Sequence, residues 1–248
     1  MRKLLLILLL LPLFGFGQHH MMHVLASQGA GGTTLKTGLL SVWEFDETSG
    51  TTAYDAHASN DGTTFGATVN QTGKINKAYD YTEGTTDKVS ISDPFYGLTS
   101  FSVSVWFKVD DVSGTKGIVS DWDSPYRSVL FRLSDASIQF YTYTGTQVGG
   151  TFASISAATW YHVVITYDGS DMEMYINNSL DGTSFSQTGT IGETGTHTSY
   201  IGNYVTSSFT TLSFDGLIDQ VAIWNRALTS TEVSTLYNSS NGLTYTSW

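Results

Sequence analysis

The sequence predicts an all-β protein, folded as a two-sheet antiparallel β-sandwich that ends in one short helix. Many short runs alternate apolar and polar residues, and clusters of Gly, Asn, Asp and Ser separate these runs at intervals typical of turns. The chain has 248 residues with 25 Gly and 3 Pro, and helix-favouring sequence is scarce outside the N-terminus. One sandwich domain of about 200 residues accounts for this length, so a second domain is not required.

The N-terminal segment, residues 1–17, has the features of a secretory signal peptide. Two basic residues precede an apolar core at 4–14 that is too short to span a bilayer comfortably. Gly15 and Gly17 provide the small residues of a cleavage site before Gln18. The alternative is a buried helix or a membrane anchor. We expect an exported protein, secreted or at the cell surface, with no membrane span in its mature form.

The charge balance excludes two classes of partner. The formal net charge is −11, and loss of the signal peptide would make the chain more acidic still. Nucleic acids and anionic membranes are bound by basic patches, so neither is an expected partner. The chain has no cysteine, so an exported domain of this kind depends on its apolar core, and on any bound metal, for stability.

Residues 18–37 are expected to form a flexible linker, because they lack a sustained period and contain Gly-Ala-Gly-Gly. Three histidines in this segment could bind a metal adventitiously, although a flexible tail that happens to carry them is the simpler interpretation. The folded domain is predicted at 38–238, followed by a polar C-terminal tail at 239–248.

Alternating runs predict the strands in order along the chain. The first is LLSVWEFDE, in which Val42, Glu44 and Asp46 alternate with Trp43 and Phe45. The further predicted strands are 86–92, 100–109, 116–121, 127–133, 137–143, 159–167, 171–177, 198–204 and 214–224.

The strand FSVSVWFKV, residues 101–109, has the clearest alternation. Its five apolar residues share one face, which is expected to be core. Its other face carries two serines, a lysine and Trp106, and is expected to be a polar sheet surface with a lone indole.

Two hairpins follow. The first turns at 134–137 and directs its apolar residues to the core. The side chains expected on its reverse face are Arg132, Gln139, Tyr141 and Tyr143, with Trp106 and Tyr175 as further candidates. The second hairpin, within 159–177, turns at the Asp-Gly-Ser-Asp sequence of residues 168–171.

The short helix is predicted from a Thr-x-x-Glu capping box. Thr229 would accept a hydrogen bond from the backbone of Glu232, whose side chain would return to the N-cap backbone. The helix is expected to run to about Tyr237.

Four blocks of the sequence together resemble a known family. They are GLLSVWEFDETSGTTAYDAHASNDGT, FSVSVWFKV, TWYHVVITYDGSDMEMYIN and FDGLIDQVAIWNRALTSTEV. In this order and spacing they resemble the laminin-G-like jelly rolls of the concanavalin A-like lectin/glucanase superfamily, from about Gly38 to Tyr237. One departure is Asn177-Asn178, where the family usually has Asp-Gly. Asn tolerates the left-handed conformation, so the hairpin is expected to survive. The resemblance implies a jelly roll and, more often, a binding module than a catalyst.

Catalysis is not expected. The glucanases of this superfamily place their acids in an alternating Glu-x-Asp-x-Glu pattern, and retaining hydrolysis needs two carboxylates about 5 Å apart. Here Glu44 and Asp46 match, but Thr48 stands at the third position and Glu47 points to the other face. His162 is expected to be a packed or hydrogen-bonded sheet residue rather than a general base.

Calcium is the cofactor that the resemblance implies, in a structural role. The residues at the matching positions are Asp55, Asn60 and Asp219. Calcium prefers carboxylate and carbonyl oxygens, and a charge on the otherwise apolar strand of Asp219 needs compensation. The alternative is that these residues cap turns and accept hydrogen bonds from backbone amides.

Sugar recognition needs an aromatic ring to stack on a pyranose and polar groups to bond its hydroxyls. The preferred candidate is the loop DWDSPYR, with Trp122, Tyr126 and Arg127. The second candidate is the hairpin face with Arg132, Tyr141 and Tyr143, which cross-strand aromatic packing could also explain.

The sequence therefore predicts an exported, noncatalytic module that recognises carbohydrate or a glycosylated surface, with calcium as the expected assisting cofactor. The alternative is a protein-binding adhesion or structural module of a cell surface or a phage appendage. A glycoside hydrolase with divergent acids is the third interpretation.

Overall fold

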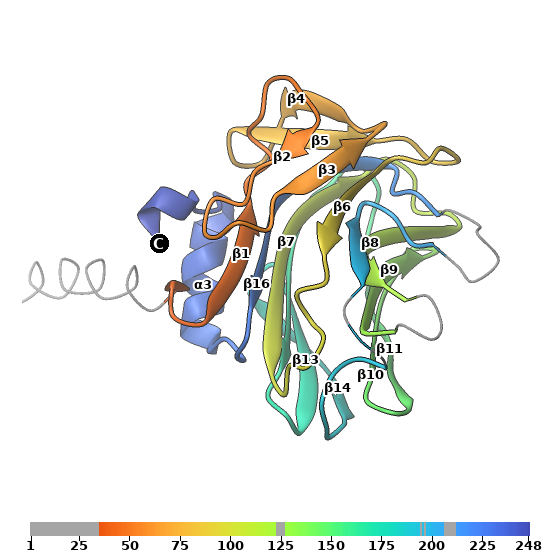
Figure 1. Ribbon diagram of the computed structural model, residues 1–248, viewed down its shortest axis with the longest axis vertical. Helices are drawn as coiled ribbons and strands as arrows, with labels where there is room; N and C mark the ends of the chain where they lie inside the picture. Colours follow the sequence, from red (N-terminus) through yellow and green to blue (C-terminus); the bar gives the residue numbers. More distant parts are fainter. Residues whose placement is uncertain (1–34, 123–126, 194, 196, 206–211) are drawn as a thin grey trace, which may run out of the picture.

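The computed structural model describes residues 35–122, 127–193, 195, 197–205 and 212–248. Two antiparallel eight-stranded sheets face each other, and one helix, α3 (Ser230–Tyr237), lies on the outer side of one of them (Figure 1). This arrangement confirms the predicted two-sheet β-sandwich with a short C-terminal helix.

Sheet A is the sheet beside α3. Its strands run in the order β14-β13-β12-β7-β16-β5-β4, and β1 also pairs with β16. Their bounds are β1 (Leu39–Trp43), β4 (Thr68–Thr72), β5 (Lys77–Tyr81), β7 (Phe101–Val109), β12 (Trp160–Tyr167), β13 (Asp171–Ile176), β14 (Ser179–Ser186) and β16 (Gly216–Trp224).

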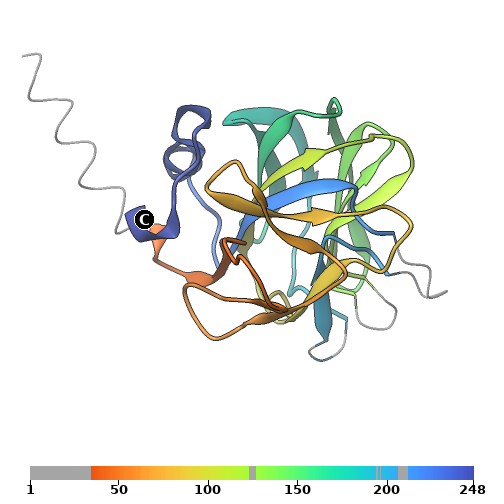
Figure 2. The same cartoon turned by 90° about the horizontal axis from the view of Figure 1, so that it is seen from above.

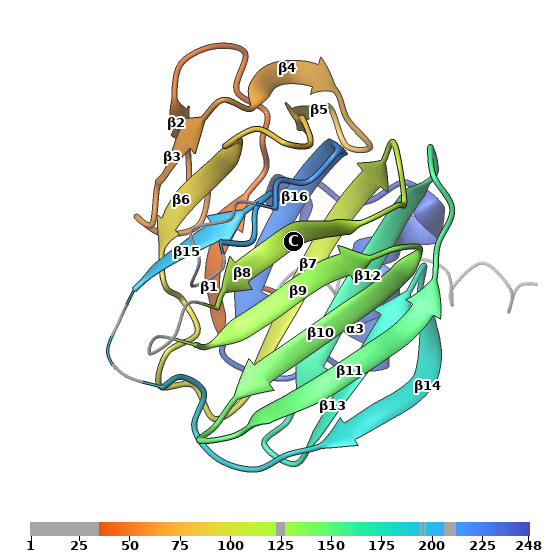
Figure 3. The ribbon, with the colours of Figure 1, turned by 90° about the vertical axis from the view of Figure 1, so that its right-hand side faces the viewer.

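Sheet B lies in front of sheet A in Figure 3. Its strands run in the order β11-β10-β9-β8-β15-β6-β3-β2. Their bounds are β2 (Thr52–Ala53), β3 (Gly62–Phe65), β6 (Lys88–Ser92), β8 (Thr115–Asp121), β9 (Val129–Ser134), β10 (Ser137–Tyr143), β11 (Gln147–Ser154) and β15 (Thr198–Ile201).

All ten predicted strands are present, with bounds that differ by a few residues. Six further strands, β2, β3, β4, β5, β11 and β14, were not predicted. Both β4 and β14 alternate only between half-buried and exposed residues, so they have no apolar face to give a period-2 signal. The interior of β11 contains Gly149 and Gly150, which weaken the strand signal in the same way.

The main core lies between the sheets. The apolar face of β7 packs there as predicted, and Phe107 contacts Phe131 of β9 edge to face, with ring centroids 6.3 Å apart. The hairpin of β9 and β10 likewise directs Phe131 and Phe140 inward and leaves Arg132 and Tyr141 half-exposed on the outer side. Large rings dominate this core, which suits the contribution of buried aromatic area to stability.

The second face of β7 corrects the prediction. It is buried beneath α3 and the residues that follow, and is not a polar surface. Trp106 is 1 % exposed and stacks on Tyr237 of α3, with ring centroids 5.8 Å apart. Trp106 and Tyr175 therefore do not share a face with Arg132 and Tyr141, because they belong to the opposite sheet and face its helical cover.

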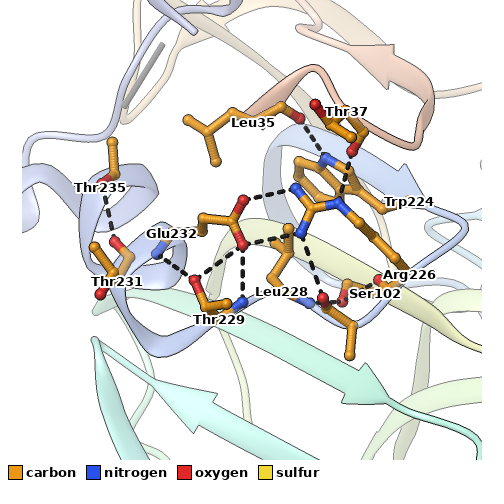
Figure 4. Close-up of polar contacts among 11 residues, drawn as sticks. Leu35, Thr37, Ser102, Trp224, Arg226, Leu228, Thr229, Thr231, Glu232 and Thr235 are labelled. Carbon is orange, nitrogen blue, oxygen red and sulfur yellow. Dashed lines mark hydrogen bonds and ion pairs between the residues drawn. The ribbon is translucent and has the colours of Figure 1, made fainter. Parts of the chain in front are cut away.

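The predicted capping box is present. Thr229 Oγ1 accepts from the backbone of Glu232, whose carboxylate accepts from the Thr229 N–H at 2.9 Å (Figure 4). The same carboxylate pairs with Arg226 at 2.6 Å, so the entry to α3 is tied to the end of β16.

Both predicted domain boundaries omit residues that pack with the sandwich. The Leu35 carbonyl accepts from Trp224 Nε1 at 2.6 Å (Figure 4), and Trp248 stacks on the same indole with ring centroids 5.6 Å apart. The C-terminal end lies beside the first described residues (Figure 2), where Lys36 Nζ is 4.4 Å above the Tyr245 ring. The partners of Leu35 and Lys36 lie at the other end of the domain in sequence, so local patterns did not reveal these contacts.

The predicted signal peptide and the three histidines of residues 18–37 lie outside the described residues. None of the described helices is long and apolar enough to cross a membrane.

Candidate functional site

The acidic cluster after β1 supports neighbouring loops. The strand ends at Trp43, and Phe45 has a φ of 57°, so the alternation of Glu44 and Asp46 is interrupted. Glu44 accepts from the Tyr245 N–H at 2.9 Å, and Asp46 accepts from the Lys77 N–H at 2.9 Å.

Glu47 completes this pattern. It accepts from the Tyr54 N–H at 2.7 Å and from the Tyr79 hydroxyl at 2.9 Å. Each of the three carboxylates is therefore engaged by a backbone N–H, which accounts for its position without a catalytic role.

His162 is a packed sheet histidine, as predicted. Its Nε2 is 2.9 Å from Ser104 Oγ, and its ring stacks on Trp106 with centroids 4.7 Å apart. Burial lowers the pKa of His162 to about 3, so the imidazole is neutral at physiological pH.

Asp55 and Asn60 lie together in one loop, where internal hydrogen bonds hold both. Asp55 Oδ1 accepts from the N–H groups of Val42 and His57 at 2.9 and 3.0 Å, and Oδ2 accepts from the Asn60 N–H at 3.2 Å. The Asn60 side chain forms two hydrogen bonds of 3.1 Å with the backbone of Ser92. This is the turn-capping arrangement that formed the alternative to calcium binding.

Asp219 is fully buried on β16 and faces the turn between β4 and β5. Its Oδ2 accepts from the Ile75 N–H at 2.7 Å, whereas Oδ1 has no hydrogen-bond partner. Burial raises the pKa of Asp219 to about 8. Within the described part of the chain, no group of three or more His, Cys, Asp or Glu residues is arranged to hold a metal ion. Protein contacts thus account for Asp55 and Asn60 but not for Asp219 Oδ1, and calcium binding stays a prediction.

The outer face of sheet B brings most of the predicted sugar-binding residues together. Arg132 lies between two tyrosine rings, with its guanidinium carbon 5.7 Å from the centroid of Tyr141 and 5.6 Å from that of Tyr204. Arg132 Nε donates to Gln139 Oε1 at 2.9 Å, and Gln139 donates onward to Thr151 at 3.2 Å. These contacts fix the direction of a planar cation on this face.

Trp122 extends the same surface at the end of β8. Its indole lies 6.3 Å from the Tyr141 ring, so the two candidate surfaces predicted from the sequence form one continuous surface. Beside it lies a cleft with a volume of about 160 Å³. The residues that line the cleft are Ser120, Asp121, Trp122, His197, Thr198, Tyr200 and Val205.

Arg127 and Tyr143 lie at the border of this surface. The Arg127 guanidinium is 4.9 Å above the Tyr143 ring and pairs with Glu193 at 3.3 Å. Tyr126 lies outside the described residues, so its predicted role is untested.

Tyr200 and Tyr204 are site residues that sequence reasoning missed. The signal was present, because Ile201 is a core residue and its neighbour Tyr200 must then point outward. Lys88 and Phe65 were also missed. Lys88 Nζ lies 5.5 Å from the Phe65 ring and 5.3 Å from the Tyr200 ring, which extends the surface across β6 and β3.

We call this surface the sheet B platform. Its side chains are Phe65, Lys88, Trp122, Arg132, Gln139, Tyr141, Tyr200 and Tyr204. A larger hollow of about 380 Å³ lies elsewhere, between the β10–β11 turn and the end of β14, and its lining carries no aromatic ring. Only the platform therefore combines rings with planar polar groups among these two surfaces.

Comparisons with known proteins agree with the architecture. A family model described as the concanavalin A-like lectin/glucanases superfamily matches residues 82–234. No curated protein sequence matches the chain.

Three solved structures illustrate the likeness. The binding domain of Paraclostridial Mosquitocidal Protein 1 has a TM-score of 0.64 at 18% identity, over 83% of this chain and 53% of that one. Domain 4 of AbnA, an extracellular arabinanase from Geobacillus stearothermophilus in complex with arabinotriose, has a TM-score of 0.61 at 21% identity, over 83% and 98%. Botulinum neurotoxin type C, whose cell entry depends on two ganglioside molecules, has a TM-score of 0.63 at 14% identity, over 86% and 53%. The chain thus spans about half the length of the two toxin structures.

Proposed function

The chain belongs to the concanavalin A-like lectin/glucanases superfamily, and on that basis we propose that it is a noncatalytic module that binds carbohydrate through the sheet B platform. The observation that carries the proposal is the continuous surface of Trp122, Tyr141 and Arg132 beside the cleft at Tyr200. Aromatic rings stack on the apolar faces of sugars, and the guanidinium and amide groups beside them bond hydroxyls.

The similar structures support the choice of ligand class. One of them holds arabinotriose, and another belongs to a toxin that depends on gangliosides. Since these likenesses are below 25% identity, they support the fold, and the argument for this chain rests on the platform itself.

The absence of catalysis is part of the proposal. The acidic residues that resemble the glucanase pattern, Glu44, Asp46 and Glu47, all accept hydrogen bonds from backbone N–H groups of other loops. These hydrogen bonds engage the carboxylates in holding the loops together. Burial nevertheless raises the pKa of Glu44, so Glu44 is the acid to test for a catalytic role.

The proposed module is exported, and calcium is its proposed structural cofactor. Export is supported by the apolar segment at 1–17, and N-terminal sequencing of the secreted protein should find Gln18 as the first residue. The calcium ligands would be Asp55, Asn60 and Asp219, with carboxylate and amide oxygens of the type that calcium prefers.

A glycan array tests the function directly. We expect the natural chain to bind a defined set of glycans, and Trp122→Ala and Tyr200→Ala each to weaken that binding at least tenfold. Tyr54→Ala is the matched control, because Tyr54 is 61% exposed and lies on a loop outside the platform. Each variant is first checked for an unchanged melting temperature.

Three outcomes would contradict the proposal. Binding that survives both platform variants would place the sugar site elsewhere. A flat array with capture of a protein partner would favour the adhesion alternative, and release of sugar that is lost in Glu44→Gln would favour the hydrolase.

A further inference from the structure

Charge is distributed unequally between the two sheets. The described strands of sheet B contain one acidic residue, Asp121, which is buried, and three basic residues, Lys88, Lys116 and Arg132. The strands of sheet A contain five acidic residues, namely Asp80, Asp171, Glu173, Asp181 and Asp219, and two basic residues, Lys77 and Lys108. In a protein with a net charge of −11, the strands of sheet B thus have more basic than acidic residues, whereas the strands of sheet A have more acidic than basic ones.

Two of these three cations belong to the platform. Lys116 is fully buried and pairs with Glu83 at 3.2 Å, so it does not face a ligand. Arg132 and Lys88 are half-exposed on the outer face, each in contact with two aromatic rings.

Arg132 is oriented before any ligand arrives. The rings of Tyr141 and Tyr204 hold its plane, and Gln139 accepts from its Nε. Within the described residues, its two terminal nitrogens make no hydrogen bond. A guanidinium held in this way presents a planar fork that matches a carboxylate or sulfate group, at a smaller entropic cost than a mobile side chain.

Lys88 supplies a second positive charge along the same surface. It contacts Tyr200, which lies in one row with Tyr141 through the register pairs Tyr200–Ser120, Ser120–Leu130 and Leu130–Tyr141. Three strand spacings separate the two tyrosines, which is about 14 Å. The strand order β9-β8-β15-β6 likewise places three strand spacings between Arg132 and Lys88, so the two cations suit an oligosaccharide rather than one sugar.

We infer that the sheet B platform selects acidic glycans, namely oligosaccharides that carry carboxylate or sulfate groups. This inference rests on the proposed function and names its substrate class. Arg132 receives one acid group and Lys88 another, while Tyr141 and Tyr200 stack on the sugar rings between them. A nucleic acid is the less suitable ligand, because its binding depends on many phosphate contacts and the protein as a whole is acidic.

Titration calorimetry with matched probes tests this inference. The probes are an oligogalacturonate, its methyl ester, dextran, dextran sulfate and a single-stranded oligonucleotide of equal charge. We expect the oligogalacturonate or the dextran sulfate to bind at least tenfold more tightly than its uncharged counterpart. The pair that shows this difference identifies carboxylate or sulfate as the recognised group. The difference should shrink as salt is raised.

Charge-removing variants locate the effect. Arg132→Gln and Lys88→Gln should each weaken binding of the acidic probe about ten- to a hundredfold, as expected for the loss of a charge-assisted hydrogen bond. Lys36→Gln is the control, because it removes the same charge from a lysine that contacts the Tyr245 ring beside the C-terminal end. Arg132→Lys, which keeps the charge but loses the fork, should recover only part of the affinity.

Several outcomes would overturn the inference. Equal binding of charged and uncharged probes would leave a neutral-glycan module, so that the proposed function stands and the acidic specificity falls. Equal binding of the oligonucleotide would mean attraction by charge alone. No binding of any glycan would remove the proposed function together with the inference, and an equal loss in Lys36→Gln would mean that net charge, not the platform, is responsible.

Discussion

Two buried ionisable side chains on sheet A predict a specific dependence of stability on pH. Asp219 and His162 are the register partners of Trp106 on either side, so the three residues form one row beneath the C-terminal cover. Both titratable groups are almost completely buried, and burial disfavours the charged form of each. Burial therefore raises the pKa of the carboxyl group and lowers the pKa of the imidazole.

For His162, acid is destabilising. Burial lowers its pKa from 6.5 to about 3, so the unfolded chain takes up a proton before the folded chain does. The stability associated with neutral His162 is fully present above pH 6.5 and is lost as the pH falls toward 3. At about 1.4 kcal/mol for each pKa unit, the loss approaches about 5 kcal/mol in total, and about 2 kcal/mol of it falls between pH 6.5 and 5.

For Asp219, base is destabilising. Burial raises its pKa from 3.8 to about 8, so the folded chain keeps a proton that the unfolded chain has released. The stability associated with protonated Asp219 is fully present below pH 3.8 and is lost as the pH rises toward 8. About 2 kcal/mol of this loss falls between pH 6.5 and 8. Between pH 5 and 6.5 the two groups compensate each other, so the protein should be most stable there.

Two conservative variants separate the contributions. Asp219→Asn retains an oxygen for the Ile75 N–H and cannot ionise, and His162→Gln retains a polar group near Ser104. We expect the free energy of unfolding of Asp219→Asn to be constant from pH 8 to 6.5 and then to fall by about 2 kcal/mol by pH 5. The free energy of unfolding of His162→Gln should instead increase steadily as the pH falls from 8 to 5.

Urea unfolding at pH 5, 6.5 and 8 measures these free energies, with and without a chelator. Parallel profiles for the natural chain and Asp219→Asn in the chelator would refute the argument from burial. If the natural chain loses stability above pH 6.5 only in the chelator, then a cation compensates Asp219 when calcium is present, as the calcium proposal requires.

Three further predictions concern stability. The melting temperature should be higher in calcium than in a chelator, because calcium at a hundred times its Kd would stabilise the folded state by about 2.7 kcal/mol. An unchanged melting temperature would remove calcium from the proposal. Glu232→Ala should cost about 1–2 kcal/mol in urea unfolding, because it removes the reciprocal cap and the partner of Arg226; an unchanged midpoint would contradict this. Trp248→Ala should cost about 2–4 kcal/mol through exposure of Trp224, whereas Thr246→Ala, an exposed control, should cost less than about 0.5 kcal/mol.

Local chemistry made the two hairpins predictable. Alternation specified which side chains of β9, β10, β12 and β13 face the core, and turn residues specified where the chain reverses. The departure at Asn177-Asn178 is accommodated as expected, with φ angles of 50° and 67° in the left-handed region. The capping box of α3 was predictable for the same reason, since its partners are three residues apart.

The outer face of β7 was not predictable, because alternation reports that two faces differ and not what covers each of them. Two serines and one tryptophan resemble a polar surface until α3 and the C-terminal residues are placed on it. Strands such as β14 form through backbone hydrogen bonds to a neighbouring strand, here β13. This pairing does not require an apolar face, so the sequence of β14 shows no apolar period.

The candidate site likewise has residues that the sequence could identify and a grouping of residues that it could not. Trp122, Arg132 and Tyr141 were identifiable as outward polar or aromatic residues, because each stands beside a buried neighbour in its own strand or loop. Their union with Tyr200, Tyr204 and Lys88 depends on strand order, which places β15 beside β8 and β6.

The sequence by itself determined the all-β class, the main hairpins and their inward faces, and the capped helix, because these depend on contacts between residues close in the chain. Only the tertiary structure decided that sheet A is covered and sheet B is open, and that Lys88 and Arg132 lie together on the open face of sheet B. Those features arise from the pairing of strands distant in sequence, where backbone hydrogen bonds set the neighbours and side-chain pattern carries little information about them.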